Sequence, residues 1–230
     1  MPLAIDLYCG LGGWTEGLLA EGYDVIGFDI EKHEYGEDLY PGLLVIQDVL
    51  TLHGSQFKDV DLIVGSSPCQ EFSYRAMPWK RAKALGPPEL GMKLFEAQFR
   101  IQREASEAAG RHIPMVVENV CGAQPWVGRA RWNYASYYLW GDVPTLMPSA
   151  PHRRMKFPGN CGPRMWRDRD VVRLNGGEEH AFHQKLENSA FVNASSGSSA
   201  RKAASAKIAK IPLALSSHIG RVYLPRSAAA

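Results

Sequence analysis

The first 140 residues alternate short apolar runs with stretches of helical spacing, and this alternation most restricts how the chain can fold. Strands that alternate with helices are typical of a mostly parallel sheet with helices on both faces. The pattern predicts an α/β fold with helices at 14–20 and 91–110 and strands at 3–8, 25–28, 43–46, 62–64, 113–117 and 134–140.

Polar residues and glycines gather where the predicted strands end. The carboxyl ends of parallel strands lie along one edge of a sheet, and ligands of such sheets bind beyond that edge. We therefore expect one cleft to be lined by the segment 6–13, Asp29, Asp48, Cys69 and Glu118.

The sequence pattern changes after residue 140. Prolines become frequent and periodicity is lost, and then a polar stretch, 193–199, precedes a predicted helix at about 203–219 with a break near Pro212. We divide the chain into a core at 1–140, an irregular region at 141–200 and a C-terminal part at 201–230.

Composition excludes several classes of protein. The 26 Lys+Arg and 24 Asp+Glu nearly balance and 45% of residues are hydrophobic, so the chain is not wholly disordered. No apolar run approaches the ~20 residues of a membrane span, and the N-terminus lacks the features of a secretory signal. We expect a cytoplasmic protein, without a membrane or an obligate protein partner, as a monomer.

The four cysteines lie far apart in the sequence. Zinc sites built from cysteine need closely spaced pairs, so no metal is expected, and a disulfide framework is not expected without secretion. A small buried hydrophobe is the default role of a cysteine, and we assign it to Cys9, Cys121 and Cys161.

The first candidate site is the glycine-rich turn after the first strand. Gly10, Gly12 and Gly13 allow the backbone to turn tightly and to approach a ligand, and Asp29, at the end of the next strand, can accept bonds from ribose hydroxyls. No Lys-Ser/Thr pair follows, so this is not a nucleoside-triphosphate loop. Together these features favour a cofactor that contains adenosine.

The second and third candidate sites supply a nucleophile and an acid. Cys69 follows Pro68 at the end of a strand, where its thiolate could attack a carbon electrophile. Glu118 leaves a buried strand into the same cleft, and partial burial favours the neutral carboxyl that donates a proton.

These three segments, in this order, resemble the cytosine-5 DNA methyltransferase family. Residues 6–13 look like its cofactor motif, Pro68-Cys69-Gln70 like its nucleophile motif and Glu118-Asn119-Val120 like its acid motif. Residues 211–220 are similar to the C-terminal motif, whose helix returns to close the cofactor pocket. The resemblance implies a Rossmann-like fold that binds S-adenosylmethionine and methylates carbon 5 of a cytosine flipped out of double-stranded DNA.

The resemblance also implies residue roles. Cys69 would add to the cytosine ring, Glu118 would protonate or bind N3, Asn119 would position the Glu118 loop, and Arg129 or Arg131 would hold the base oxygen. Cofactor contacts would come from Tyr8, Gly10, Leu11, Gly12, Gly13, Asp29, Ile30, Asp48, Val49, Pro68 and Leu94.

Two departures concern the recognition of DNA. The Arg129-x-Arg131 pair follows the acid motif closely and lacks the family's preceding glutamine, and only region 141–200 remains for target recognition. Basic residues dominate part of that region and are the predicted phosphate contacts, with Met165 and Trp166 among them as base-stacking candidates: Arg153, Arg154, Lys156, Arg164, Arg167 and Arg169.

Two alternatives stay open. The same nucleophile and acid motifs occur in a branch of the family that methylates cytosine in tRNA. A catalytically silent, DNA-binding regulatory relative would also keep the fold, although the presence of both Cys69 and Glu118 argues against it. The compact length is compatible with a phage enzyme or a solitary enzyme, and the sequence does not distinguish these from a member of a restriction system.

Overall fold

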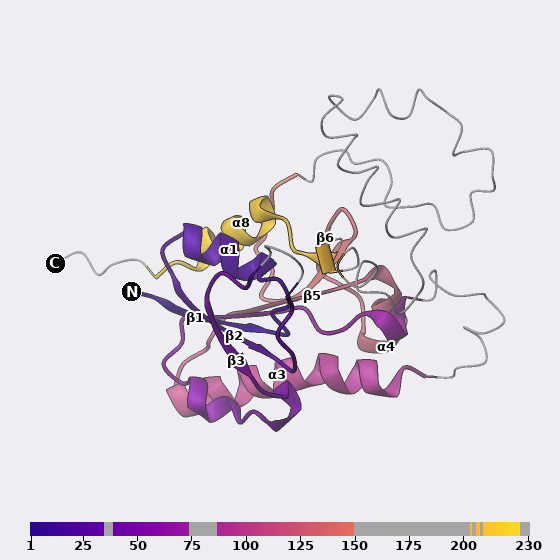
Figure 1. Ribbon diagram of the computed structural model, residues 1–230, viewed down its shortest axis with the longest axis horizontal. Coiled ribbons are helices and arrows are strands. Elements are labelled where there is room, and N and C mark those ends of the chain that lie inside the picture. The colour runs from indigo at the N-terminus through magenta and orange to yellow at the C-terminus, as the bar shows by residue number, and fades with distance from the viewer. Residues whose placement is uncertain (35–38, 74–86, 150–202, 204–205, 208, 226–230) are drawn as a thin grey trace. The chain divides into compact units, whose positions relative to one another are not determined.

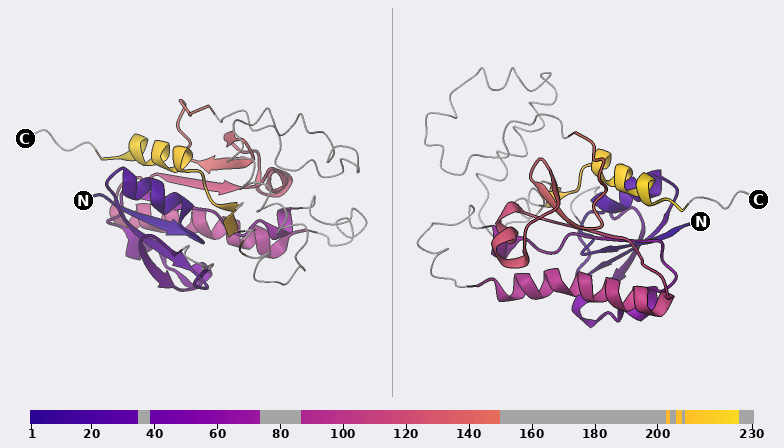
Figure 2. Two further views of the ribbon diagram at one scale, coloured as in Figure 1. Left: turned by 45° about the horizontal axis from the view of Figure 1, so that its top comes forward. Right: turned by 180° about the vertical axis from the view of Figure 1, so that it is seen from behind.

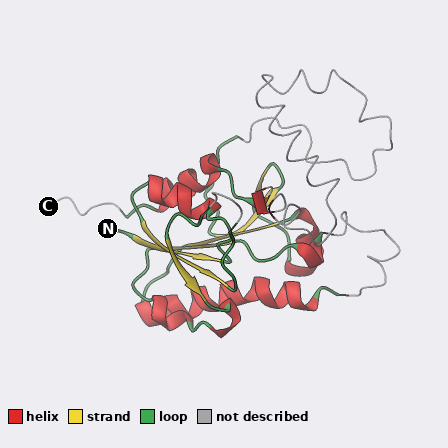
Figure 3. Cartoon of the chain, viewed as in Figure 1, coloured by secondary structure: helices red, strands yellow, loops and turns green. Residues whose placement is uncertain are grey.

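A computed structural model describes residues 1–34, 39–73, 87–149, 203, 206–207 and 209–225. It contains a seven-stranded sheet of order β3-β2-β1-β4-β5-β7-β6. Figure 3 shows the strands in yellow and the helices in red. The strands are β1 (Leu3–Leu7), β2 (Asp24–Asp29), β3 (Leu43–Ile46), β4 (Leu62–Gly65), β5 (Met115–Asn119), β6 (Trp132–Tyr134) and β7 (Tyr137–Gly141).

The first five strands run parallel, and β7 lies antiparallel between β5 and β6. Helices lie on both faces, so the predicted α/β class is confirmed (Figure 1). The α-helices are α1 (Gly13–Ala20), α3 (Glu89–Ala109), α4 (Gln124–Val127) and α8 (Leu213–Tyr223). Short 3-10 turns occur at η1 (Val49–Thr51), η2 (Gly54–Phe57), η3 (Gln70–Phe72) and η5 (Cys121–Ala123).

The prediction of one continuous strand at 134–140 is wrong. The structure has a hairpin there, in which β6 ends at Tyr134 and β7 begins at Tyr137. The chain reverses at Ala135, which has a positive φ of 54°. A left-handed turn is usually signalled by Gly, Asn or Asp, so the alanine concealed it.

The two faces of the sheet carry separate hydrophobic cores, and Figure 2 shows the helices on either side. On one face α1 packs against α8, and Trp14, Leu18, Leu215 and Ile219 are buried between them and the sheet. On the other face α3 contributes buried residues such as Phe95 and Ile101 to a core with η1 and η2.

Helix α8 and the residues just before it pack the C-terminal end of the described chain against its N-terminal part. Tyr23 Oη donates to the Gly220 carbonyl at 3.0 Å, and Lys210 Nζ lies 2.6 Å from a Glu16 carboxylate oxygen. Gly17 permits this approach, because a Cβ there would lie 2.1 Å from Ser216 Oγ. The helix starts directly after Pro212, where the sequence predicted a break.

Residues 1–150 and 210–230 form one compact unit, and residues 151–209 form another. The boundaries predicted at 140 and 200 stay predictions. All six predicted phosphate contacts, Met165, Trp166 and Cys161 lie outside the described residues. No helix among the described residues could span a membrane.

Candidate active site

The glycine-rich turn joins β1 to α1 in a tight left-handed path. Tyr8, Gly10 and Gly12 all have positive φ, of 58°, 52° and 74°. Gly12 also faces the segment that follows residue 38, because a Cβ there would lie 2.5 Å from Pro41 Cδ. Only glycine meets both conditions at this position, which explains the motif that the sequence displays.

Asp29 fastens this turn to the end of β2. Its Oδ2 accepts from the Gly10 N–H at 2.9 Å, and its Oδ1 accepts from the Ile30 N–H at 2.8 Å. Burial opposes ionisation, but bonds from His33 and from the Gly10 N–H outweigh it, so the pKa of Asp29 lies below its usual value. The ionised carboxylate keeps capacity for further donors, because each oxygen can accept more than one bond.

Asp6 lies beneath the turn and is 1% exposed. Its Oδ2 accepts from Thr15 Oγ1 at 2.8 Å, while its Oδ1 has no hydrogen-bond partner in the described structure. Burial raises the pKa of Asp6 to about 7, and the Thr15 bond moderates that rise. The turn therefore covers a carboxyl group that can change charge near neutral pH.

Three further predicted cofactor residues hold local structure. Tyr8 Oη donates to the Leu94 carbonyl at 2.9 Å, which brings these two residues together. Asp48 caps η1, since its Oδ1 accepts from the Leu50 N–H at 2.9 Å. Val49 is buried in η1, whereas Ile30 is 70% exposed.

The loop that carries Cys69 is held to the end of β5. Asn119 Nδ2 donates to the Ser67 carbonyl at 3.0 Å and lies 3.1 Å from Ser67 Oγ. On the other side, Trp14 Nε1 donates to Ser66 Oγ at 3.0 Å. Pro68 and Cys69 follow these two serines, so the nucleophile loop is fixed to both the acid strand and α1.

Glu118 and Cys69 differ in exposure. Glu118 is 8% exposed, and because side chains alternate along a strand it shares a face of the sheet with Val116, toward α1 and α8. Cys69 is half-buried at the start of η3. Cys9 is buried as expected, but Cys121 is exposed in η5, so the expectation of a buried hydrophobe is wrong there.

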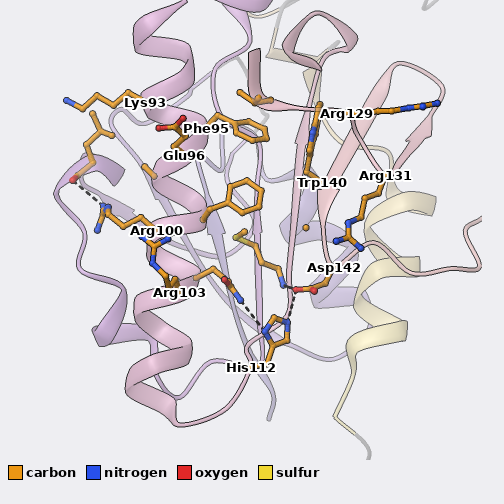
Figure 4. Close-up of a pocket in the computed structure, with 17 residues that line it drawn as sticks. Lys93, Phe95, Glu96, Arg100, Arg103, His112, Arg129, Arg131, Trp140 and Asp142 are labelled. Carbon is orange, nitrogen blue, oxygen red and sulfur yellow. Dashed lines mark hydrogen bonds and ion pairs between the residues drawn. The ribbon is translucent and has the colours of Figure 1, made fainter. Parts of the chain in front are cut away.

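Arg129 and Arg131 lie elsewhere. Both line a pocket of about 950 Å³ on the α3 side, together with Phe95, Trp140 and Asp142 (Figure 4). The Arg131 side chain extends toward Asp142, and Arg129 points outward at the edge of the view. The structure therefore does not bring these arginines to the face that Glu118 shares, and their contact with a base stays a prediction.

Sequence reasoning missed the residues that hold the site together. Thr15 bonds Asp6, Tyr40 bonds Thr15 and Ser66 accepts from Trp14, yet Thr15, Tyr40 and Ser66 belong to no segment that the sequence singled out. Ser67 begins the segment that carries Cys69, but its bond from Asn119 was not predicted.

Comparison with known proteins agrees with this arrangement. Residues 3–84, which include the glycine-rich turn and the Cys69 loop, match the family model described as C-5 cytosine-specific DNA methylase. This part of the chain is similar to that methylase family. A curated relative, the Type II methyltransferase M.DdeI of Desulfomicrobium norvegicum, is 40% identical over 78 residues, which are 30% of this chain and 19% of the relative.

Solved structures similar to this chain include a protein described as a prophage-encoded DNA modification methyltransferase of E. coli. It is 25% identical with a TM-score of 0.39, over 54% of this chain and 33% of that one. The Entamoeba histolytica methyltransferase EhMeth is 17% identical with a TM-score of 0.38, over 54% and 40%. Both TM-scores are below 0.5, so the fold assignment rests on the strand order of this chain itself.

The chain spans about one fifth of the length of its curated relative and one third of that of the prophage protein. The segment that matches the family model ends at residue 84, before Glu118 and Asn119. The contact between Asn119 and Ser67 connects the matched and unmatched parts of the site.

Proposed function

We propose that this chain is an S-adenosylmethionine-dependent DNA methyltransferase that modifies carbon 5 of cytosine. One observation carries the proposal. Asn119, directly after Glu118, donates to Ser67, two residues before Cys69, and so joins the acid strand to the nucleophile loop. The family match covers the loop but not the acid, so this contact is independent support.

The residues present fit the cofactor. Gly10 faces open space, since a Cβ there would meet no atom within 4 Å. The pKa of Asp29 lies below its usual value and backbone N–H groups position its carboxylate, which suits it to ribose hydroxyls. Asp6, whose pKa burial raises to about 7, adds negative charge beneath the turn when it is ionised. When bound there, the cofactor supplies an electrophilic methyl group. Asp48, Tyr8 and Leu94 would form the adenine side.

Cys69 and Glu118 then divide the chemistry. Carbon 5 of cytosine is a weak nucleophile until the Cys69 thiolate adds to carbon 6, while Glu118 donates a hydrogen bond or proton to N3 and prevents charge from building on the ring. Carbon 5 takes the methyl group, and loss of its proton expels the Cys69 thiolate. Such a base must leave the duplex, which costs a few kcal/mol.

Asn119 has a positioning role in this scheme. Its amide holds the Ser67 carbonyl, and its own Oδ1 accepts from the Val120 N–H at 2.8 Å. Movement of the acid strand would therefore move the cysteine loop as well. Region 141–200, with its basic residues, would supply the contacts to DNA phosphates.

A covalent trap tests the proposal. Duplex DNA that contains 5-fluorocytosine cannot lose a proton from carbon 5, so the enzyme should remain attached through Cys69. We expect a stable adduct, on the peptide that carries Cys69, only when cofactor is present. The same duplex with ordinary cytosine is the control. An adduct formed on 5-fluorocytosine in tRNA but not in DNA would favour the tRNA alternative, and no adduct on either would contradict the proposal.

A further inference from the structure

The glycine-rich turn is buttressed by a chain of two hydroxyl groups that ends on Asp6. Thr15 Oγ1 donates to Asp6 Oδ2 at 2.8 Å and lies 2.6 Å from Tyr40 Oη. Because a threonine hydroxyl has one proton, which goes to Asp6, Tyr40 must donate to Thr15. Both donors thus point toward the buried carboxylate. We call these three residues the hydroxyl chain.

Tyr40 occupies a space that only glycines leave open. A Cβ on Gly27 would lie 2.2 Å from Tyr40 Oη, and one on Gly12 would lie 3.1 Å from Tyr40 Cδ2. The ring therefore fits between β2 and the glycine-rich turn, and its hydroxyl anchors it there. The neighbouring Pro41 contacts Gly12 as well, so this segment covers the part of the turn with left-handed backbone.

We propose that Tyr40 is a positioning residue for the cofactor, which acts through Thr15 and Asp6 to hold the glycine-rich turn in its binding shape. The inference rests on the proposed function, because it assumes that the turn binds the cofactor. Tyr40 touches neither reacting atom in this scheme. Its ring orders the turn, and its hydroxyl donates to Thr15, which in turn donates to the Asp6 carboxylate beneath the turn.

The hydroxyl chain also couples cofactor affinity to pH. Burial opposes the ionisation of Asp6, the Thr15 bond favours it, and the charge of Asp29 adds to the opposition. Cys9 and Asp29 are the other titratable groups near Asp6 and Tyr40. S-adenosylmethionine and S-adenosylhomocysteine share a cationic ammonium group, which binds better above an ionised Asp6. The affinity for either compound therefore falls as pH drops and Asp6 takes a proton. Without the Tyr40 donor, the Thr15 hydroxyl donates less strongly to Asp6, so the pKa of Asp6 rises. The decrease in cofactor affinity then occurs at higher pH.

The test measures binding of S-adenosylhomocysteine by calorimetry, together with steady-state kinetics. We expect Tyr40→Phe to raise the Kd for S-adenosylhomocysteine and the KM for S-adenosylmethionine roughly tenfold, with kcat changed less than about twofold. The pH midpoint of binding should rise by roughly half a unit. Thr15→Val should act in the same direction, and Thr15→Ser should restore binding because it keeps the hydroxyl.

Tyr23→Phe is the matched control, since Tyr23 is buried and its hydroxyl bonds the Gly220 carbonyl away from the turn. It should lower the unfolding temperature without moving KM or the pH midpoint. Equal binding and equal midpoints in wild type and Tyr40→Phe would overturn the inference, as would equal changes in Tyr23→Phe.

The two experiments distinguish failure of this inference from failure of the proposed function. If the chain binds S-adenosylhomocysteine and Tyr40→Phe weakens it, but no 5-fluorocytosine adduct forms, the inference stands and the proposed substrate fails. If the adduct forms while Tyr40→Phe leaves binding and its pH midpoint unchanged, only the inference fails. A wild-type chain that binds no S-adenosylhomocysteine overturns both.

Discussion

The two faces of the sheet are covered in different ways. On the α1 side the chain closes on itself, because α8, near the C-terminus, buries Leu215 and Ile219 against α1. On the α3 side a single long helix covers the centre, and a pocket of about 950 Å³ stays open beside Trp140. The connection from β5 to β6 contains only η5 and the four-residue α4, too little chain to cover that side.

The two faces also differ in the features that they carry. The closed face carries the glycine-rich turn, the hydroxyl chain and the face of β5 to which Glu118 belongs. The open face carries exposed cations such as Lys93 and Arg103 around a pocket. We therefore expect variants along the carboxyl edge and the closed face to be costly and variants around the pocket to be mild.

The largest predicted effect is on the rate of methyl transfer. Cys69→Ser should lower methyl transfer to DNA at least about a thousandfold, because a hydroxyl is far less nucleophilic than a thiolate, while S-adenosylhomocysteine binding stays within about twofold. Arg103→Gln in the pocket and Cys121→Ser in η5 are the controls, and both should retain activity. Full activity of Cys69→Ser in a radiolabelled methyl-transfer assay would remove the assignment of the nucleophile.

The next largest predicted effect is a loss of stability when packing on the closed face is reduced. Ile219→Ala removes a fully buried side chain from α8, and we expect the free energy of unfolding to fall by about 3 kcal/mol in chemical denaturation. Leu213→Ala is the matched control, since Leu213 begins the same helix and is 55% exposed. Similar losses for both variants would show that α8 does not close this face.

The contact between the acid strand and the nucleophile loop should matter for rate rather than for cofactor binding. Asn119→Ala removes the donor to Ser67, and we expect kcat to fall roughly 10- to 100-fold because the two catalytic groups lose their relative position. Asn133→Ala, which removes a surface bond to the Ala135 carbonyl, should change kcat less than about twofold. If both asparagine variants retain full kcat, the positioning role is wrong.

The smallest predicted effect concerns pH. The pKa of Asp6 is raised by burial to about 7, so the folded state binds this proton more tightly than the unfolded state does, and stability falls as pH rises from about 4 to 7. Asp6→Asn should abolish this contribution, which amounts to about 2 kcal/mol between pH 5 and 7. Denaturation curves at several pH values measure the difference, and parallel pH dependences of wild type and variant would contradict the assigned pKa.

Much of the fold was predictable because its signals are local. The runs that became β1 to β5 are apolar and short, Gly110 ends α3 in a left-handed conformation, and the polar ends of the strands marked one edge. The prediction failed at Ala135, where a left-handed turn has no glycine to announce it, and at Cys121, whose exposure depends on how η5 leaves the sheet.

Local sequence signals were sufficient to predict the parallel sheet, the glycine-rich turn and the order of Cys69 and Glu118, because strand ends and glycines follow from short-range chemistry. The contacts between residues far apart in the chain came from tertiary packing. Tyr40 reaches Asp6 through Thr15, Asn119 reaches Ser67 across 52 positions, and Tyr23 meets Gly220 across 197. Such contacts depend on strand order and on which face each side chain takes, and these are fixed when the whole chain packs.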